Sequence, residues 1–126
     1  MGRVREYIKV KARPCWTLFD SGAENTYVAA AAAAPLRPEK LRRARKTRLG
    51  GNLHTITRDC RLVALVDGKP VEVRAYVIDR IGRDRRARRD FDVLFGARAM
   101  QDWGIELNLK RERLDLSGYP GEFVEF

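Results

Sequence analysis

Short runs of alternating apolar and polar residues, separated by turn residues, recur along this chain. The first run is Arg5–Ala12, and a second, Cys15–Asp20, follows it directly after Pro14. Alternation with a period of two favours half-buried β-strands, because successive side chains of a strand point to opposite faces. About seven or eight such strands follow one another at a spacing of about ten residues, which is typical of small β-barrels and sandwiches. The sequence therefore predicts an all-β fold.

Turn residues mark where several of these strands are joined. Gly50–Asn52 and Asp67–Pro70 are hairpin signals between runs rich in β-branched residues. The alternating leucines of 105–116 predict a final hairpin across a Lys-Arg-Glu-Arg turn. The tail 118–126 can supply one more short strand.

Helical signals are few. Ala99, Met100 and Trp103 lie at helical spacing, and Gly104 can end that helix, so one short helix is expected near the C-terminus. The six alanines 29–34, stopped by Pro35, predict a second short helix or helical turn.

Two basic segments are harder to assign. The segment 39–49 fits either a helix or a charged strand. The segment 80–90 has few apolar residues and no capping pattern, so we expect an exposed loop there.

The length and composition favour one globular domain over residues 1–126. The chain has 126 residues, of which 44% are hydrophobic, enough to bury a modest core. No run approaches the roughly 20 apolar residues needed to span a bilayer, and the charged first residues do not resemble a secretory signal. The expected compartment is therefore the cytoplasm, without membrane attachment. Cys15, Cys60 and the single His54 have no zinc or redox spacing, so no metal or cofactor is expected.

The net charge of +9 raises the possibility of a nucleic-acid partner. The excess is clustered in 37–48 and 83–89. Neither segment is interleaved with the aromatic residues that stack on bases. A basic nucleic-acid-binding β module is thus an alternative that we do not favour.

The stretch Trp16–Val28, WTLFDSGAENTYV, places a carboxylate at the end of an apolar strand. Burying a charge there is costly unless the carboxylate is paired or hydrogen-bonded. Asp20 could be a turn residue whose carboxylate accepts backbone N–H bonds. It could also be a catalytic acid.

One pattern occurs twice and carries a resemblance to a known family. In both TLFDSG (17–22) and VLFG (93–96), an apolar strand runs into a glycine turn. LFDSGAE resembles the Asp-Thr/Ser-Gly-Ala turn of the retropepsin-like aspartic proteases, and 92–116 resembles their closing apolar-apolar-Gly, helix and hairpin element. LGGNLHT (49–55) falls where that family has its flap, a glycine-tipped hairpin over the substrate. The resemblance covers about residues 5 to 118 and implies a small closed β-barrel of retropepsin type with one short C-terminal helix.

The resemblance also implies an activity. Two carboxylates held close together share one proton, so that one activates a water molecule and the other polarises the scissile carbonyl of a peptide or protein substrate. This chain has one Asp-Ser-Gly, because Asp67 lies in a polar turn and Asp115 lacks an apolar strand before it. The second carboxylate is therefore expected from a second copy, in the homodimer that the family uses. A catalytically inactive peptide-binding domain of the same fold is the remaining alternative.

Residue roles carry over at the matching positions. The catalytic turn would be Asp20, Ser21 and Gly22, with Ser21 joining the two copies of the turn by hydroxyl-to-backbone hydrogen bonds. The substrate-binding residues would be Ala23 and Glu24 in the groove, and Gly50 and Gly51 at the flap tip. The structural support beneath the turn would be Leu94, Phe95 and Gly96.

The sequence departs from the family pattern at three places. Ala97 stands where an arginine is common, and Arg98 comes one position later, which puts the local salt bridges in doubt. Glu24 is longer than the usual aspartate. The segment 80–90 resembles an insertion, and its six arginines would favour acidic peptides in the groove.

Overall fold

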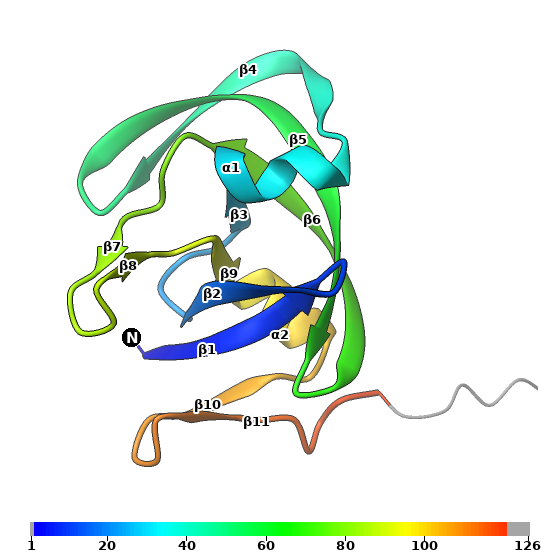
Figure 1. Cartoon of the computed structure of the whole chain (residues 1–126), viewed down its shortest axis with the longest axis vertical. Coiled ribbons are helices and arrows are strands. Elements are labelled where there is room, and N and C mark those ends of the chain that lie inside the picture. The colour runs from blue at the N-terminus through cyan, green and yellow to red at the C-terminus, as the bar shows by residue number, and fades with distance from the viewer. Residues whose placement is uncertain (1, 121–126) are drawn as a thin grey trace, which may run out of the picture.

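The computed structural model describes residues 2–120, and these are mostly β-structure (Figure 1). The strands are β1 (Arg3–Val10), β2 (Arg13–Asp20), β3 (Thr26–Ala29), β4 (Glu39–Leu49), β5 (Asn52–Val66), β6 (Lys69–Ile78), β7 (Arg83–Asp84), β8 (Arg89–Asp90), β9 (Val93–Gly96), β10 (Glu106–Asn108) and β11 (Arg113–Asp115). The helices are α1 (Ala30–Ala33), the 3-10 turn η1 (Ala34–Leu36) and α2 (Ala97–Asp102). The predicted all-β class, the helix near the C-terminus and the final hairpin are confirmed.

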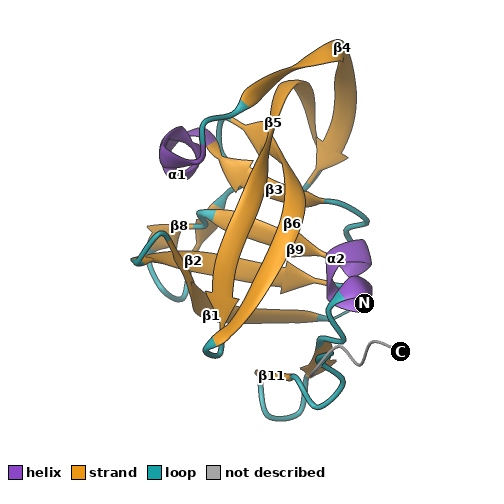
Figure 2. Cartoon of the chain, turned by 90° about the vertical axis from the view of Figure 1, so that its right-hand side faces the viewer, coloured by secondary structure: helices purple, strands orange, loops and turns teal. Residues whose placement is uncertain are grey.

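Most strands belong to one sheet with the order β1-β2-β9-β3-β6-β5-β4. Strand β1 also pairs with β5, through Lys9 with Leu65 and Val10 with Ala64. This short pairing joins six strands into a ring, and β4 remains outside the ring at the edge of the sheet (Figure 2). The β10–β11 hairpin and the β7–β8 hairpin are separate two-stranded sheets.

One face of strand β2 packs into the core, and the other face points toward the candidate site. Phe19 is fully buried in the larger hydrophobic cluster, whereas Leu18 belongs to a second cluster with Leu94. Because side chains of a strand alternate, Asp20 shares the face of Leu18. The sequence pattern of β2 therefore decides which way the carboxylate points.

The alanine run forms less helix than its composition suggests. Only Ala30–Ala33 is α-helical, and Thr26–Ala29 before it is the strand β3. Tyr27 and Val28 in this strand are buried and lie between β6 and β9. Tertiary pairing thus overrides the helix propensity of the first alanine.

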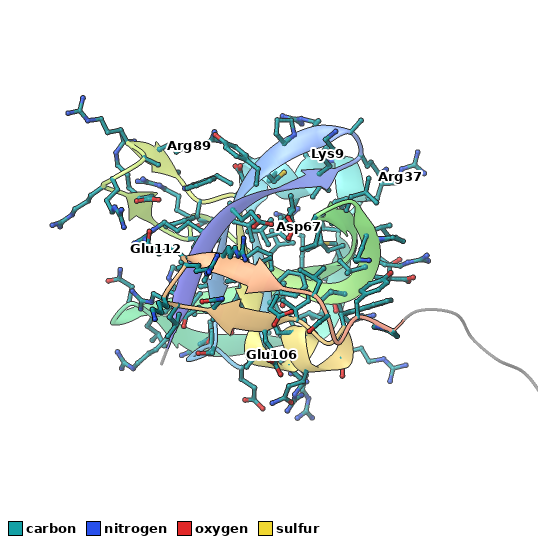
Figure 3. All side chains as sticks on the ribbon, turned by 90° about the horizontal axis from the view of Figure 1, so that it is seen from below. Lys9, Arg37, Asp67, Arg89, Glu106 and Glu112 are labelled. Atoms are coloured by element: carbon teal, nitrogen blue, oxygen red, sulfur yellow. The ribbon has the colours of Figure 1, made fainter. Side chains whose placement is uncertain are left out.

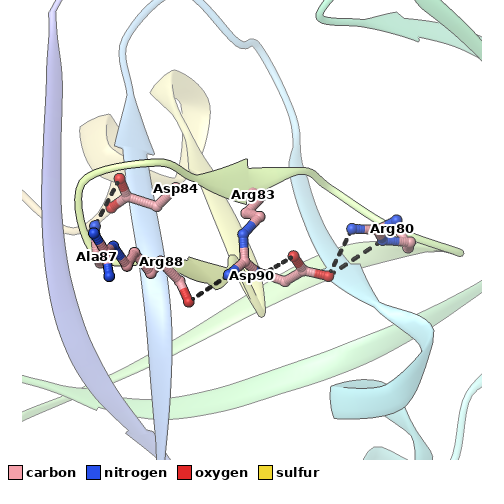
Figure 4. A network of polar contacts seen from close by, with 6 residues as sticks. All are labelled: Arg80, Arg83, Asp84, Ala87, Arg88 and Asp90. Carbon is pink, nitrogen blue, oxygen red and sulfur yellow. Dashed lines mark hydrogen bonds and ion pairs between the residues drawn. The ribbon is translucent and has the colours of Figure 1, made fainter.

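The prediction of an exposed loop at 80–90 is wrong in part. β7 and β8 form a small antiparallel ladder, and the Asp84 side chain is buried. Its carboxylate accepts hydrogen bonds from Trp16 Nε1 at 3.0 Å and from the backbone N–H of Arg86 at 3.0 Å, and Arg5 Nε lies 3.2 Å away. Burial alone would raise the pKa of Asp84, but these hydrogen bonds and the Arg5 charge together lower it. Figure 4 shows contacts within this segment, from Asp84 to Ala87 and from Asp90 to Arg80 and Arg83.

The basic segment 39–49 is the charged strand β4, not a helix. It forms a hairpin with β5 whose tip is Gly50 and Gly51, with φ angles of +57° and +84°. These angles explain why the turn is built from glycine. The strand expected in the tail is not found over 118–120, and its remainder lies outside the described residues. None of the described helices has the length and apolar character to cross a membrane.

Gly96 lies where two parts of the chain approach too closely for a side chain. A Cβ at Gly96 would lie 2.1 Å from the backbone oxygen of Asn25 and 3.0 Å from that of Ala23. The loop after Asp20 thus rests directly on the end of β9, which pairs in parallel with β2.

The carboxyl of Glu6 on β1 faces that of Asp67 in the β5–β6 turn, which lies beside β1 in Figure 3. Burial, together with the hydrogen bond and the charge of Asp67, raises the pKa of Glu6 from the ordinary 4.5 to about 8. The folded chain therefore holds a proton on Glu6 over a pH range in which the unfolded chain loses it.

We predict that Gly96→Ala lowers the free energy of unfolding by more than about 2 kcal/mol, because backbone must move to admit the new methyl group. Urea unfolding measures this. The matched control is Gly51→Ala, where nothing lies within 4 Å and only backbone strain of about 1 kcal/mol is expected. An equal cost for both substitutions would contradict this packing.

We also predict that stability falls as the pH rises between 4.5 and about 8, the ordinary and the folded-state pKa of Glu6. The contribution of Glu6 is complete below the lower value and is lost as the pH passes the upper one. Glu6→Gln, which removes the titration, should therefore make the thermal midpoint of unfolding less dependent on pH. The control is Glu106→Gln at an exposed carboxyl. A Glu6→Gln profile parallel to that of the unmodified protein would show that Glu6 does not keep its proton.

Candidate active site

Asp20 lies at the end of β2 with its carboxylate 11% exposed. Its Oδ1 accepts a hydrogen bond from the backbone N–H of Gly22 at 2.8 Å. Its Oδ2 lies 3.3 Å from Nε of Arg3, the residue opposite it in the β1–β2 register. The bond to Gly22 fits both hypotheses for Asp20, since a turn residue and a catalytic carboxylate would each accept it.

Ser21 is engaged by the N-terminal end of the chain. The Gly2 N–H donates to Ser21 Oγ at 2.8 Å, and the Ser21 N–H donates to the Gly2 oxygen at 3.0 Å. The hydroxyl also donates to the same oxygen at 3.2 Å. Within this single chain, the groups by which Ser21 would join two copies of the turn are therefore already hydrogen-bonded to Gly2.

The end of β9 supports the turn from below. The Gly96 N–H donates to Oγ1 of the buried Thr26 at 3.0 Å. Phe95 packs against Phe19, with ring centroids 4.9 Å apart. Leu94 instead faces the open side, beneath the turn.

The start of helix α2 is tied to the loop that follows Asp20. The Ala97 N–H donates to the Ala23 oxygen at 2.7 Å, and the Arg98 N–H donates to the Glu24 oxygen at 3.1 Å. The Arg98 guanidinium also forms an ion pair with the Glu24 carboxylate. Glu24, which is longer than the usual aspartate, thus pairs with the arginine that stands one position later than usual. The salt bridge that the sequence put in doubt is therefore formed.

A groove of about 730 Å³ lies above the turn. Predicted residues that line it are Asp20, Gly22, Ala23, Glu24, Gly50 and Leu94; Ser21, Gly51, Phe95 and Gly96 are not among its lining residues. The tip of the β4–β5 hairpin therefore reaches the groove through Gly50. Both apolar residues and exposed arginines line the groove.

Several lining residues could not be assigned from the sequence. Tyr27 and Thr47 line the groove and form a side-chain hydrogen bond of 3.1 Å. Ile81 lies in the segment 80–90, for which an exposed loop is expected, and Phe91 follows that segment directly. Arg3 was missed because its contact with Asp20 depends on the β1–β2 register. The alternation of apolar and polar residues near the start of the chain predicts a strand. It does not tell which residue of that strand lies opposite Asp20.

Both carboxylates that line the groove form ion pairs within residues 2–120. Of its two acidic residues, Glu24 pairs with Arg98, while Asp20 faces the groove with Arg3 beside it. Asp67 lies in the β5–β6 turn and Asp115 in β11, away from the groove. Within residues 2–120, no three His, Cys, Asp or Glu side chains gather as a metal site would need.

The sequence matches no protein-family model and no curated protein. The structure is similar to the retroviral protease-like domain of Ddi1 from Leishmania major, with a TM-score of 0.67 and 16% identity over 95% of this chain and 94% of that one. It is also similar to EIAV protease complexed with the inhibitor HBY-793, with a TM-score of 0.55 and 19% identity over 86% of this chain and 94% of that one.

Both likenesses extend over nearly the whole domain. At these identities the likeness concerns the fold. The chain therefore has the retropepsin-like fold, as the resemblance of its sequence to that family implies.

Proposed function

We propose that this chain is an aspartic endopeptidase that acts as a homodimer. The observation that carries the proposal is the position of Asp20. Its carboxylate lies at the end of a buried strand and lines a groove of about 730 Å³. Gly22 fixes its orientation through the 2.8 Å hydrogen bond to Oδ1. A turn residue with no further role would not need to face a groove of this size.

A second carboxylate is required for the chemistry. Two carboxylates within a few ångströms cannot both ionise, so the pair holds one proton and titrates as a unit. A twofold axis beside the turn would place Asp20 of a second copy opposite the first, since such an interface is made from the same surface on both chains. The homodimer follows from this need and from the family resemblance.

The reaction is then general acid–base catalysis. The ionised carboxylate takes a proton from a water molecule, and the water oxygen attacks the peptide carbonyl carbon. The protonated carboxyl polarises the carbonyl oxygen, and the tetrahedral species collapses when the leaving nitrogen receives a proton. The hairpin tip at Gly50 and Gly51 would close over the bound peptide and exclude bulk water.

Arg3 and Gly2 oppose this chemistry in the single chain. The Arg3 guanidinium forms an ion pair with Asp20, and a second carboxylate beside Asp20 would have to replace it. The Arg3 side chain is 63% exposed and long, so it can turn away from Asp20. Ser21 would exchange its bonds to Gly2 for bonds across the dimer axis.

The groove favours extended peptides with apolar side chains near the scissile bond. Its lining includes the buried apolar residues Leu18, Phe91 and Leu94 and the exposed cations Arg48 and Arg83. Acidic residues at the ends of the bound peptide would therefore be favoured over basic ones.

We predict that Asp20→Asn abolishes cleavage of a diverse peptide library between about pH 4 and 7, by at least about 100-fold. The asparagine still accepts the Gly22 hydrogen bond but cannot exchange a proton as the carboxylate does. Mass spectrometry of the products gives the cleavage sites. The matched control is Asp115→Asn, an identical change at an exposed carboxyl outside the groove.

Two results would count against the proposal. Cleavage that persists in Asp20→Asn would place the chemistry elsewhere. If the folded and dimeric protein cleaves no peptide, the chain has the fold of these proteases but not the peptidase activity.

A further inference from the structure

Most of the net positive charge of this protein lies in two segments. Residues 37–48 contain seven Lys or Arg and one Glu, a net of +6, and residues 80–90 contain six Arg and two Asp, a net of +4. The total is +9, so the remainder of the chain is close to neutral. The charge is therefore a local feature and not a general property of the surface.

The two segments use their cations differently. In 80–90, Arg80 and Arg83 pair with Asp90 (Figure 4). Arg86 pairs with Glu112, and Arg89 pairs with Asp92. The arginines of this segment largely hold its own fold together.

The cations of β4 are not used in this way. They are Lys40, Arg42, Arg43, Arg45, Lys46 and Arg48, and none forms an ion pair with any residue of 2–120. Arg45 alone has a side-chain partner there, the Tyr76 hydroxyl at 2.7 Å. The charge of this strand thus remains available to a partner.

Strand β4 is also an open edge. It pairs with β5 and has no strand on its other side among the described residues (Figure 2). An edge strand leaves alternate backbone N–H and C=O groups without strand partners, so it can accept one more strand. Its like charges repel the same edge of another copy, but acidic side chains on an added strand would gain cross-strand pairs.

A bulge widens this edge near its start. Lys40 pairs with Arg58 and Arg45 with Ile56, so the residues between Lys40 and Arg45 face Thr57 alone. A recess of about 500 Å³ lies there, with Arg42, Arg43 and Arg45 in its lining. The buried Asp59 nearby is already paired with Arg74 at 2.6 Å. The lining carries five cations against the two carboxylates Glu39 and Asp59, and this excess of positive charge favours an anionic group in the recess.

The same edge fits a peptide better than a nucleic acid. Single-stranded nucleic acids are held by aromatic rings that stack on bases, and β4 contains no aromatic residue. The Arg45 guanidinium already lies over the ring of Tyr76, 5.7 Å from its centroid. A peptide instead matches both the open backbone and the repeat of the charges along the strand.

We propose that the outer edge of β4 binds an acidic, extended segment of a partner protein. The segment adds a strand to the sheet, and its carboxylates pair with Arg42, Arg43 and Lys46. This docking edge is separate from the Asp20 carboxylate and does not depend on cleavage. If the chain is a peptidase, the edge would hold a part of its substrate outside the groove.

The test uses the full chain carrying Asp20→Asn, so that the probe stays intact. The probe is a fluorescent twelve-residue peptide of alternating Glu and Thr, and its anisotropy gives the affinity at low and moderate salt. We expect binding that weakens as salt rises, and a loss of about 10-fold in Arg42→Gln/Arg43→Gln/Lys46→Gln from three lost pairs. None of these three residues lines the groove that holds Asp20. The matched control is Arg85→Gln/Arg86→Gln/Arg88→Gln, which removes the same charge and should change the affinity by less than about 2-fold.

Strand addition is tested on the probe, which leaves the protein unchanged. Two further peptides carry N-methyl groups on alternate backbone amides, one at each Glu and the other at each Thr. An added strand needs one set of amides, so at least one of these peptides should bind about 10-fold more weakly. Equal binding by all three peptides would overturn strand addition.

The remaining outcomes also decide the proposal. No binding of the acidic peptide, or equal losses in the two triple variants, would overturn the docking edge. Tighter binding of a twelve-residue oligothymidine would assign the surface to nucleic acid instead. None of these results depends on whether Asp20 is catalytic.

Discussion

The parallel pairing of β2 with β9 is the contact on which the rest of this molecule depends. It brings Asp20 beside Gly96, two residues that are far apart in the sequence. The loop after Asp20 lies so close to Gly96 that no side chain fits between them. The Gly96 N–H then reaches Thr26, and the start of α2 holds the backbone of Ala23. One crowded contact thus fixes the turn, the strand that follows it and the helix beneath it.

Among residues 2–120, the turn that this contact positions has an arginine beside Asp20 where the proposed reaction would need a second carboxylate. Asp20 is oriented by Gly22 and opens into a groove, yet its nearest charged neighbour is Arg3 and not a second carboxylate. Gly2 occupies the hydrogen-bonding groups of Ser21. These interactions satisfy the turn within one chain, and a second copy would have to replace them. Dimer formation and activation would then be one event.

Much of this arrangement could be predicted from the residues alone. The strand that ends at Asp20, the glycine-tipped hairpin and the helix after Gly96 all have local signals, namely alternation, turn glycines and helical spacing. The contacts that were missed depend on long-range register. Arg3 meets Asp20 only because β1 and β2 pair as they do. Asp84 in an arginine-rich segment gave no local sign that Trp16 and Arg5 would bury it.

The central claim is that the catalytic site is assembled from two copies of Asp20. The most direct measurement is the rate of peptide cleavage per chain as the protein is diluted through the range in which it dissociates. If two chains form the site, the rate per chain falls in proportion to concentration below the dissociation constant, and sedimentation velocity shows the dimer disappearing over the same range. A rate per chain that stays constant while the protein becomes monomeric would contradict the shared site, and would mean that one chain holds all the groups that the reaction needs.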